Sequence, residues 1–400
     1  MPNMAPDRVA TGVKPPLGIY LHWPFCTAIC PYCDFNVHVA RHANDVDAQV
    51  WATAYAAELR HAHGLRPDGP VQTVFFGGGT PSLMSADLVG AILQTIDALW
   101  GLADKAEISL EANPSPRHGP MQVSDVYLRD LRAAGVRRLS LGAQAFDDAA
   151  LKKLGRAHSA AEARETFLLA QKIFPYSSFD LIYARPGQSL AAWQNELQAA
   201  LALAPQHMSL YQLTIEPDTP FAGLAAKGQL ALPDEDMAAD FYELTQTLCE
   251  AAGLSAYEVS NHAASGHACR HNMASWQGGD YLGIGPGAHG RLTRLGRRWA
   301  SQALRAPHAW REQVNAQGHG WENLTPLDAE AHQMEAVMLG LRLTDGISLA
   351  DLAARHVVLD DARLAAARAD GLLSDDPQKL QASRQGRLLL DTLIARLLLD

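Results

Sequence analysis

Three cysteines lie close together near the start of the sequence, with the spacing C-x3-C-x2-C. They occupy the segment Cys26-Thr-Ala-Ile-Cys30-Pro-Tyr-Cys33, in which Pro31 hinders formation of a helix. Thiolates on so short a segment can converge on one metal centre. A conventional [4Fe–4S] cluster takes four cysteine ligands, whereas the other two cysteines, Cys249 and Cys269, are more than two hundred residues away. One iron would therefore be open to a small chelating ligand, like the open position of a catalytic zinc.

A structural zinc ion is the alternative interpretation of these cysteines. Its fourth ligand would be His22, His38 or His42. Structural zinc sites more often use paired C-x2-C knuckles than a C-x3-C-x2-C segment. The spacing therefore favours the iron–sulfur cluster.

Glycine-rich or polar loops follow several apolar runs downstream of the cysteines. The run Gly77-Gly78-Gly79-Thr80 would let a ligand approach the backbone, although a tight turn would also explain three glycines. Glu111 could accept a hydrogen bond from a ribose hydroxyl or a cationic group, or be a solvated acid at a strand end. Gln144, Arg156 and Asp180 add a neutral, a positive and a negative group farther along the chain. These residue types suit the binding of a polar cofactor.

Short apolar runs alternate with amphipathic stretches from Leu17 to about Glu216, and each such polar loop follows an apolar run. The expected strands are Leu17–His22, Gln72–Phe76, Glu107–Ala112, Arg138–Gly142, Phe179–Tyr183 and Met208–Ile215. The expected helices between them are Asp45–His63, Ala86–Trp100, Val126–Ala134, Ala160–Ile173 and Leu190–Leu203. Six strand-then-helix units predict an α/β fold with a parallel sheet, curled or open. Chemistry collects at the carboxyl edge of such sheets, so the loops are expected to form one site.

Four segments are expected along the chain: a flexible leader over 1–16, the strand–helix body over 17–232, an extension over 233–324 and a small helical domain over 325–400. The extension should begin with a helix from about Asp234 to Ala252. Its segment His262 to Gly290 is so rich in glycine that we expect no regular structure there. The last domain should start at Thr325-Pro326 and be of winged-helix type, with short strands around Leu380–Ala382 and Leu388–Leu390.

Composition restricts the function classes and the compartment. A formal net charge of −10 over 400 residues argues against nucleic acid as the main partner. We expect no signal peptide, because the first 16 residues lack an apolar core, and no transmembrane segment, because charges interrupt the apolar stretches. Three neighbouring cysteines among five favour metal ligation over disulfides, which predicts a location in the reducing cytoplasm.

Several stretches together identify a family. They are Ile19–Cys26, Gly77–Ser82, Glu111–Pro114, Ser140–Phe146, Asp180–Tyr183, Tyr211–Pro217 and Asp280–Gly285. With the C-x3-C-x2-C spacing, they make the chain from about Leu17 to Asp400 resemble the HemN/HemW group of the radical S-adenosylmethionine (SAM) superfamily. The resemblance implies a partial (β/α)6 TIM-like barrel with a C-terminal, mainly helical domain. It also implies a [4Fe–4S] cluster held by Cys26, Cys30 and Cys33, with the amino and carboxylate groups of SAM on the open iron.

The resemblance also assigns the SAM-binding positions. Tyr20, Gly78 and Glu111 correspond to residues that contact the cluster-bound SAM. A second set corresponds to positions that touch a second SAM molecule in oxidase members of the group: Tyr32, Gly79, Thr80, Gln144, Arg156 and Asp180.

Two features distinguish the branches of the group. The oxidases carry a further cysteine two residues after the third, where this sequence has Phe35, as in the haem chaperones. The segment Cys269–Trp276 resembles the H-N-x-x-Y-W motif associated with haem in the chaperones, with Ser275 in place of the tyrosine. His271 and Cys269 are therefore candidate haem ligands, since imidazole and thiolate are both common axial ligands. A loop histidine bonded to the backbone is the alternative for His271.

Two functions remain open from the sequence. The resemblance favours a haem chaperone that binds haem and a SAM-liganded cluster and delivers haem to haemoproteins such as respiratory-chain enzymes, with flavodoxin or ferredoxin as electron donor. The alternative is an enzyme, an oxygen-independent coproporphyrinogen III oxidase that oxidatively decarboxylates porphyrinogen propionates.

Overall fold

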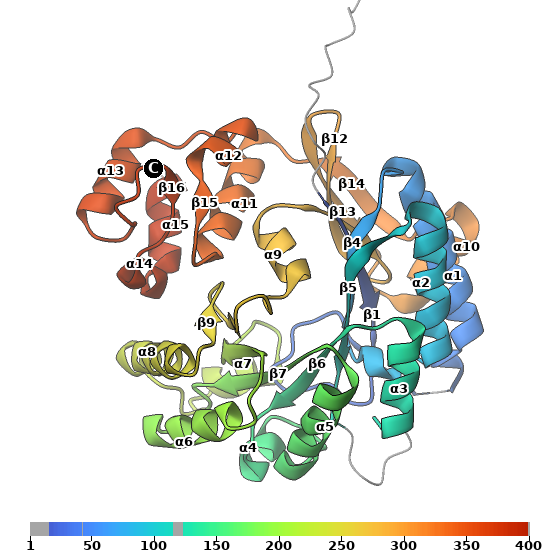
Figure 1. Ribbon diagram of the computed structural model, residues 1–400, viewed down its shortest axis with the longest axis horizontal. Coiled ribbons are helices and arrows are strands. Elements are labelled where there is room, and N and C mark those ends of the chain that lie inside the picture. The colour runs from blue at the N-terminus through green and yellow to red at the C-terminus, as the bar shows by residue number, and fades with distance from the viewer. Residues whose placement is uncertain (1–15, 42, 115–122, 399–400) are drawn as a thin grey trace, which may run out of the picture.

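The computed structural model describes residues 16–41, 43–114 and 123–398 (Figure 1). The leader expected over 1–16 thus lies outside the described residues, apart from residue 16. The described part of the chain has two main hydrophobic cores, besides a small cluster formed by Ala145, Leu151, Leu154 and Phe221. The larger core extends from Leu17 to Trp321, and the smaller one from Ala336 to Leu397.

A parallel sheet of six strands forms the centre of the larger part. In spatial and chain order they are β1 (Leu17–Trp23), β4 (Val71–Gly78), β5 (Leu102–Ala112), β6 (Arg138–Gln144), β7 (Tyr176–Tyr183) and β8 (His207–Gln212). All adjacent pairs are parallel. The six predicted strands are confirmed, except that β8 ends at Gln212 instead of Ile215. Near-continuous burial, as in β1, is typical of parallel strands covered on both faces.

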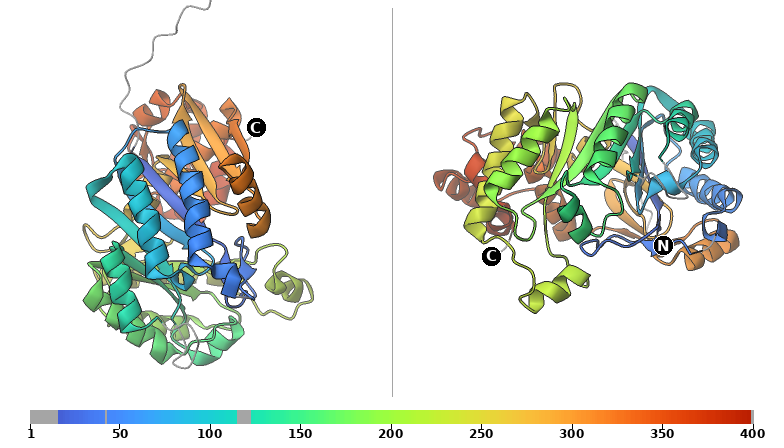
Figure 2. Two further views of the ribbon diagram at one scale, coloured as in Figure 1. Left: turned by 90° about the vertical axis from the view of Figure 1, so that its right-hand side faces the viewer. Right: turned by 90° about the horizontal axis from the view of Figure 1, so that it is seen from below.

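Helices cover the outer face of this curved sheet (Figure 2). They are α1 (Ala48–Leu65), α2 (Ala86–Trp100), α3 (Asp125–Ala134), α4 (Asp148–Lys153), α5 (Ala160–Ile173) and α6 (Leu190–Leu201). The five predicted helices of this region are confirmed to within a few residues. Their starts follow from local chemistry: Ser159, for example, forms a capping box with Glu162 at the start of α5. Two short strands, β2 (Phe25–Cys26) and β3 (His38–Val39), begin and end the cysteine loop.

The extension adds strands to both edges of the sheet. Strand β11 (Asp280–Ile284) pairs in parallel with β1, and β12 (His289–Arg294), β13 (Arg297–Ala303) and β14 (Trp321–Pro326) follow antiparallel. At the other edge, β10 (Asn261–Ala263) pairs with β8 and with β9 (Ser255–Ala256). Helices α8 (Glu235–Ala251) and α10 (Pro307–Gln317) also belong to the extension, and α7 (Pro220–Ala226) precedes it.

The expectation that His262–Gly290 lacks regular structure was wrong. The segment contains most of β10, the helix α9 (Arg270–Trp276), β11 and the start of β12. Its glycines with positive φ, such as Gly266 and Gly278, lie in the turns between these elements. They end the elements instead of preventing them.

The C-terminal part is mainly helical and contains a small antiparallel strand pair. Its elements are α11 (Ala329–Arg342), β15 (Ile347–Ser348), α12 (Leu349–Ala354), α13 (Asp361–Ala369), β16 (Lys379–Leu380), α14 (Arg384–Leu388) and α15 (Leu390–Leu398). Two expectations were wrong. Thr325-Pro326 ends β14, and the first helix begins at Ala329 because Asp328 caps it. The strand expected around Leu388–Leu390 is absent from the described residues, because α14 ends at Leu388 and α15 begins at Leu390.

Candidate functional site

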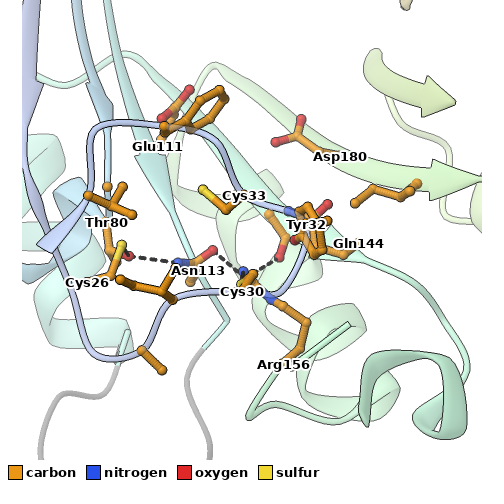
Figure 3. A pocket seen from close by; sticks show the side chains of 18 of the residues that line it. Cys26, Cys30, Tyr32, Cys33, Thr80, Glu111, Asn113, Gln144, Arg156 and Asp180 are labelled. Atoms are coloured by element: carbon orange, nitrogen blue, oxygen red, sulfur yellow. Dashed lines mark hydrogen bonds between the residues drawn. The ribbon is translucent and has the colours of Figure 1, made fainter. Parts of the chain in front are cut away.

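The cysteine loop borders a cavity of about 630 Å³ at the carboxyl ends of the parallel strands. Cys26, Cys30 and Cys33 are half-buried free thiols that line this cavity, and Figure 3 shows them on one loop, with Thr80 and Asn113 close to Cys26 and Arg156 close to Cys30. A backbone hydrogen bond of 3.1 Å from Cys33 N to Cys30 O tightens the loop. The proximity of the three sulfurs could be predicted from the sequence, because Cys26 and Cys33 are only seven positions apart.

Two polar side chains contact the thiols. Thr80 donates a hydrogen bond to Cys26 Sγ at 3.3 Å, and Arg156 donates one to Cys30 Sγ at 3.4 Å. Burial raises the pKa of the Cys26 thiol, and burial, together with the neighbouring thiols, raises the pKa of Cys33 to about 11. Both thiols are therefore neutral near pH 7 in the metal-free protein. Binding to iron would replace the proton and stabilise the thiolate.

The donor set fits an iron–sulfur cluster. Within the described ranges, no three His, Cys, Asp or Glu side chains are placed to hold a single metal ion. Among the histidines considered for zinc, His22 accepts from the Tyr20 hydroxyl and donates to Asn36 O, at 3.1 and 2.9 Å. His42 lies outside the described residues. Three soft sulfur donors around a cavity suit a multi-iron cube.

The glycine run at the end of β4 brings backbone into close contact with the cysteine loop. Gly78 has φ +105°, and a Cβ there would lie 2.7 Å from the His22 ring. A Cβ on Gly79 would lie 2.7 Å from Phe25 O. Any larger residue would therefore displace the wall of the cavity. These two contacts within the protein account for the glycines, and the approach of a ligand to their backbone stays a prediction.

Two carboxyl groups face the cavity with few partners. Glu111 at the end of β5 accepts a hydrogen bond from Gly78 N at 3.2 Å, and Asp180 on β7 accepts one from Ser140 at 3.2 Å. Removal from bulk water, and then the charge of Asp180, raise the pKa of Glu111 to about 8. Burial also raises the pKa of Asp180 to about 6, against the hydrogen bonds from Ser209 and Ser140. The cavity thus holds two acceptors that a bound ligand could satisfy.

Arg156 connects the cysteine loop to the strand ends. Besides Cys30, it donates to Gly142 O at 3.0 Å and to Asn113 Oδ1 at 2.5 Å, and Asn113 in turn donates to Thr80 Oγ1 at 3.0 Å. Gln144 adopts a positive φ of 68°, which is unfavourable for a residue with a side chain. Sequence reasoning missed Asn113 as a site residue, although it directly follows the loop that begins at Glu111.

A smaller cavity of about 350 Å³ adjoins the first one. It shares Asp34, Phe35, Gly78 and Glu111 with the larger cavity, and Tyr20 lines it. All predicted SAM-binding residues except Tyr20 therefore line the larger cavity: Tyr32, Gly78, Gly79, Thr80, Glu111, Gln144, Arg156 and Asp180. Tyr20 lies on the other side of the shared boundary.

The two candidate haem ligands line neither cavity, although the His271 ring lies 6.4 Å from the ring of Tyr20, which lines the smaller one. Cys269 and His271, at the start of α9, are only 2% and 8% exposed. The Cys269 thiol and the His271 backbone N–H both donate to Glu107 Oε1, at 3.3 and 3.2 Å. The imidazole of His271 lies 3.2 Å from the Thr73 hydroxyl and stacks on Phe75, with ring centroids 4.9 Å apart. The structure thus does not bring these two residues to the cysteine cavity.

Comparison with known proteins matches two family models. Residues 20–200 match the "Radical SAM superfamily" model, and residues 327–389 match the "HemN C-terminal domain" model. The chain is 36% identical to "Radical S-adenosyl methionine domain-containing protein 1, mitochondrial" of Bos taurus, covering 95% of this chain and 87% of the relative. It is 35% identical to "Heme chaperone HemW" of Escherichia coli, covering 95% of this chain and 97% of the relative.

A solved structure confirms the fold. It is described as "Coproporphyrinogen III oxidase (HemN) from Escherichia coli is a Radical SAM enzyme". It superposes with a TM-score of 0.78 at 22% sequence identity, over 96% of this chain and 90% of that chain. The partial barrel with a helical C-terminal domain is therefore confirmed as the fold of this chain. None of the helices in the described ranges is long and apolar enough to span a membrane.

Proposed function

The chain belongs to the HemN/HemW group of the radical SAM superfamily, and we propose that it is a haem chaperone of the HemW type. The observation that carries this proposal is the match, along 95–96% of the chain, to relatives named "Heme chaperone HemW" in Escherichia coli and Mycobacterium tuberculosis. Phe35 supports the same branch, because the oxidases have a cysteine at that position.

The superfamily implies a [4Fe–4S] cluster and SAM, and we propose that the cysteine cavity binds both. Cys26, Cys30 and Cys33 would hold three irons and leave the fourth for the amino and carboxylate groups of SAM. When bound, the pair supplies one-electron chemistry. The chain would position this cofactor: Gly78 and Gly79 line the cavity with backbone, and Glu111 offers a carboxylate oxygen to a hydroxyl or ammonium group.

Tyr20 and the second set of SAM-binding residues complete the proposed cofactor site. Tyr20 would contact the cluster-bound SAM from the smaller cavity, across the boundary at Gly78 and Glu111. Tyr32, Gln144 and the remaining residues of the second set line the larger cavity, and Thr80 and Arg156 among them also contact the thiols. Their presence is the observation that favours the second candidate function, that of a coproporphyrinogen III oxidase.

Haem is the proposed cargo, with His271 and Cys269 as candidate ligands. Burial lowers the pKa of His271 to about 4, so its imidazole is neutral and has a lone pair for iron. Both residues are buried against Glu107. Ligation through them therefore requires α9 to move away from β5.

We propose further that the acceptors are haemoproteins such as respiratory-chain enzymes, and that flavodoxin or ferredoxin supplies electrons to the cluster. The proposed compartment is the cytoplasm, where the free thiols at the cluster site stay reduced. The barrel is proposed to span 17–232, with the extension from 233 to the end of β14 at Pro326 completing the core and the C-terminal domain following it.

An anaerobic assay separates the two candidate functions. The reconstituted protein is titrated with haem and, in a parallel sample, incubated with SAM, dithionite and coproporphyrinogen III. The chaperone predicts stoichiometric haem binding by the Soret band and no porphyrinogen turnover. Protoporphyrinogen formation matched by carbon dioxide release would overturn the chaperone in favour of the oxidase.

A further inference from the structure

The smaller cavity contains a cationic group that the proposed cofactor site does not use. This cavity lies beside β1 and is lined on its outer side by Gly287, His289, Gln302 and Arg305. We propose that it is a carboxylate subsite in which Arg305 binds one propionate of the porphyrin carried by the protein. The inference deepens the haem chaperone proposal and rests on it.

Arg305 is available for a ligand. Its guanidinium donates to Asn36 Oδ1 at 3.4 Å, a long hydrogen bond to a neutral group. No carboxylate of the described residues forms an ion pair with it. An arginine that lines a cavity without an acidic partner is a natural binding group for a carboxylate, because its planar donors match the two oxygens.

The backbone around Arg305 is held in place. Asn36 donates to Arg305 O at 2.9 Å and to Pro286 O at 3.0 Å. Asn36 O in turn accepts from His22, the residue bonded to Tyr20. The cysteine loop, β1 and the end of β13 are therefore fixed relative to one another at this cavity, so that the subsite exists before the ligand arrives.

Neighbouring side chains add neutral donors. His289 on β12 and Gln302 on β13 are directly paired across the two strands, and both line the cavity. Burial and the charges of Arg291 and Arg305 lower the pKa of His289, so its ring is neutral near pH 7 and can donate one N–H. A carboxylate bound by Arg305 could thus receive a second hydrogen bond from either residue.

The other arginine that lines the two cavities is already engaged. Arg156 donates to Cys30, Gly142 and Asn113, and it is needed to fix the cysteine loop. The acidic residues of the smaller cavity are Asp34, which is exposed and therefore screened by solvent, and Glu111, which accepts a hydrogen bond from Gly78 N. Neither prevents an anion from reaching Arg305.

Phe35 supplies an apolar surface next to this subsite. Its side chain is 62% exposed and borders both cavities. A flat apolar macrocycle packed on Phe35 would cover this ring and extend a short carboxylate arm into the smaller cavity. The combination of an exposed aromatic ring and an unpaired arginine selects ligands that are apolar in the body and anionic at the edge, as porphyrins with propionates are.

Comparison of haem with haem dimethyl ester tests the inference, because the ester lacks the negative charges but keeps the macrocycle. Dissociation constants are measured for both ligands with wild type, Arg305→Gln, Arg305→Lys and a control, Arg294→Gln. Arg294 is an exposed arginine at the far end of β12. Wild type and the control should prefer haem by about tenfold, the contribution of one charge-assisted hydrogen bond. Arg305→Gln should lose this preference and Arg305→Lys should keep part of it.

The outcomes are distinguishable. If Arg305→Gln binds haem and retains the full preference over the ester, the carboxylate subsite is wrong while the haem chaperone stands. If wild type binds neither porphyrin, the proposed function fails and the subsite fails with it. Arg305 is exposed, so the variant is expected to fold, and its iron content provides the check.

Discussion

Glu107 and Glu111 lie on the same face of β5 but differ in the number of hydrogen bonds that they accept. Glu107 is 5% exposed and accepts from four groups: two guanidinium nitrogens of Arg138, the Cys269 thiol and the His271 backbone. Glu111, four residues farther along, accepts from Gly78 N. At Glu107, the lower end, Cys269 and His271 at the start of α9 cover the carboxylate, whereas Glu111, at the upper end, borders the two cavities.

The difference indicates which groups maintain the structure and which are available to a ligand. A buried carboxylate with a complete set of donors is stabilised by the protein alone, and its removal leaves Arg138 buried without a counter-charge. A carboxylate with one donor, next to glycines and free thiols, can gain its remaining partners from a ligand. We therefore expect changes at the upper end to affect cofactor binding and changes at the lower end to affect stability.

The largest expected effect is on iron content at the upper end. Cys30→Ser removes one of the three proposed cluster ligands, and the iron content of the reconstituted protein should fall from about four atoms per chain to near zero. The measurement is iron and sulfide analysis together with the visible absorption of the cluster. Cys249→Ser, which changes a buried cysteine far from the cavity, is the control and should keep its iron. Equal iron in both variants would contradict the proposed ligand set.

The next effect is on stability at the lower end. Glu107→Ala breaks a buried ion pair whose side chains are 4% and 3% exposed, and should lower the free energy of unfolding by about 3–5 kcal/mol. Urea unfolding measures this change. Glu243→Ala, which breaks the exposed ion pair with Arg384, should cost less than about 1 kcal/mol. Similar losses in the free energy of unfolding for the two variants would contradict the claim that the lower end contributes to stability.

A smaller effect on binding is expected from Glu111→Gln. The variant loses a carboxylate acceptor for the ligand, so SAM affinity should fall by about tenfold, as for loss of one hydrogen bond to a charged group. Iron content should stay at the wild-type value. Isothermal titration with SAM under anaerobic conditions measures the change. An unaltered affinity for SAM would show that Glu111 does not bind SAM and that its role, like that of Glu107, is to stabilise the fold.

The smallest effect is on the pH dependence of stability without ligand. The pKa of Glu111 is raised from 4.5 to about 8, so the folded state binds a proton more tightly than the unfolded state. Stability due to this group is therefore fully present below pH 4.5 and falls as the pH rises to about 8. Asp180 and Glu58 contribute in the same direction, with pKa values of about 6 and 7.

Unfolding free energies of wild type and Glu111→Gln across this pH range isolate the contribution of Glu111. The loss of stability with rising pH should be smaller in the variant. Parallel curves for the two proteins would show that Glu111 titrates normally in the fold.

Local sequence patterns predicted the upper end of the barrel better than the lower end. The six strands and the polar groups at their ends follow from short-range periodicity, and the cysteines converge because they share one loop. The contacts of Glu107 with Cys269 and His271 join residues more than 160 positions apart, and no local pattern indicates them. The same holds for the hydrogen bonds of Asn36 to Arg305 and Pro286.

The glycine content of His262–Gly290 was misleading for a related reason. Glycine marks the positions where the backbone turns, but the length of the element between two turns depends on its tertiary neighbours. Helix α9 has seven residues, of which His271 is buried, and it contacts β4, β11 and α11. A helix that short has little stability of its own, so its sequence alone does not indicate it.

The electron paramagnetic resonance spectrum of the reduced, reconstituted protein, recorded without and with SAM, tests the central claim most directly. The claim is that three cysteines hold an iron–sulfur cluster with one iron open to SAM. We predict a four-iron cluster whose spectrum changes when SAM is added. A protein that retains no iron under these conditions, or a cluster whose spectrum is the same with and without SAM, would contradict it.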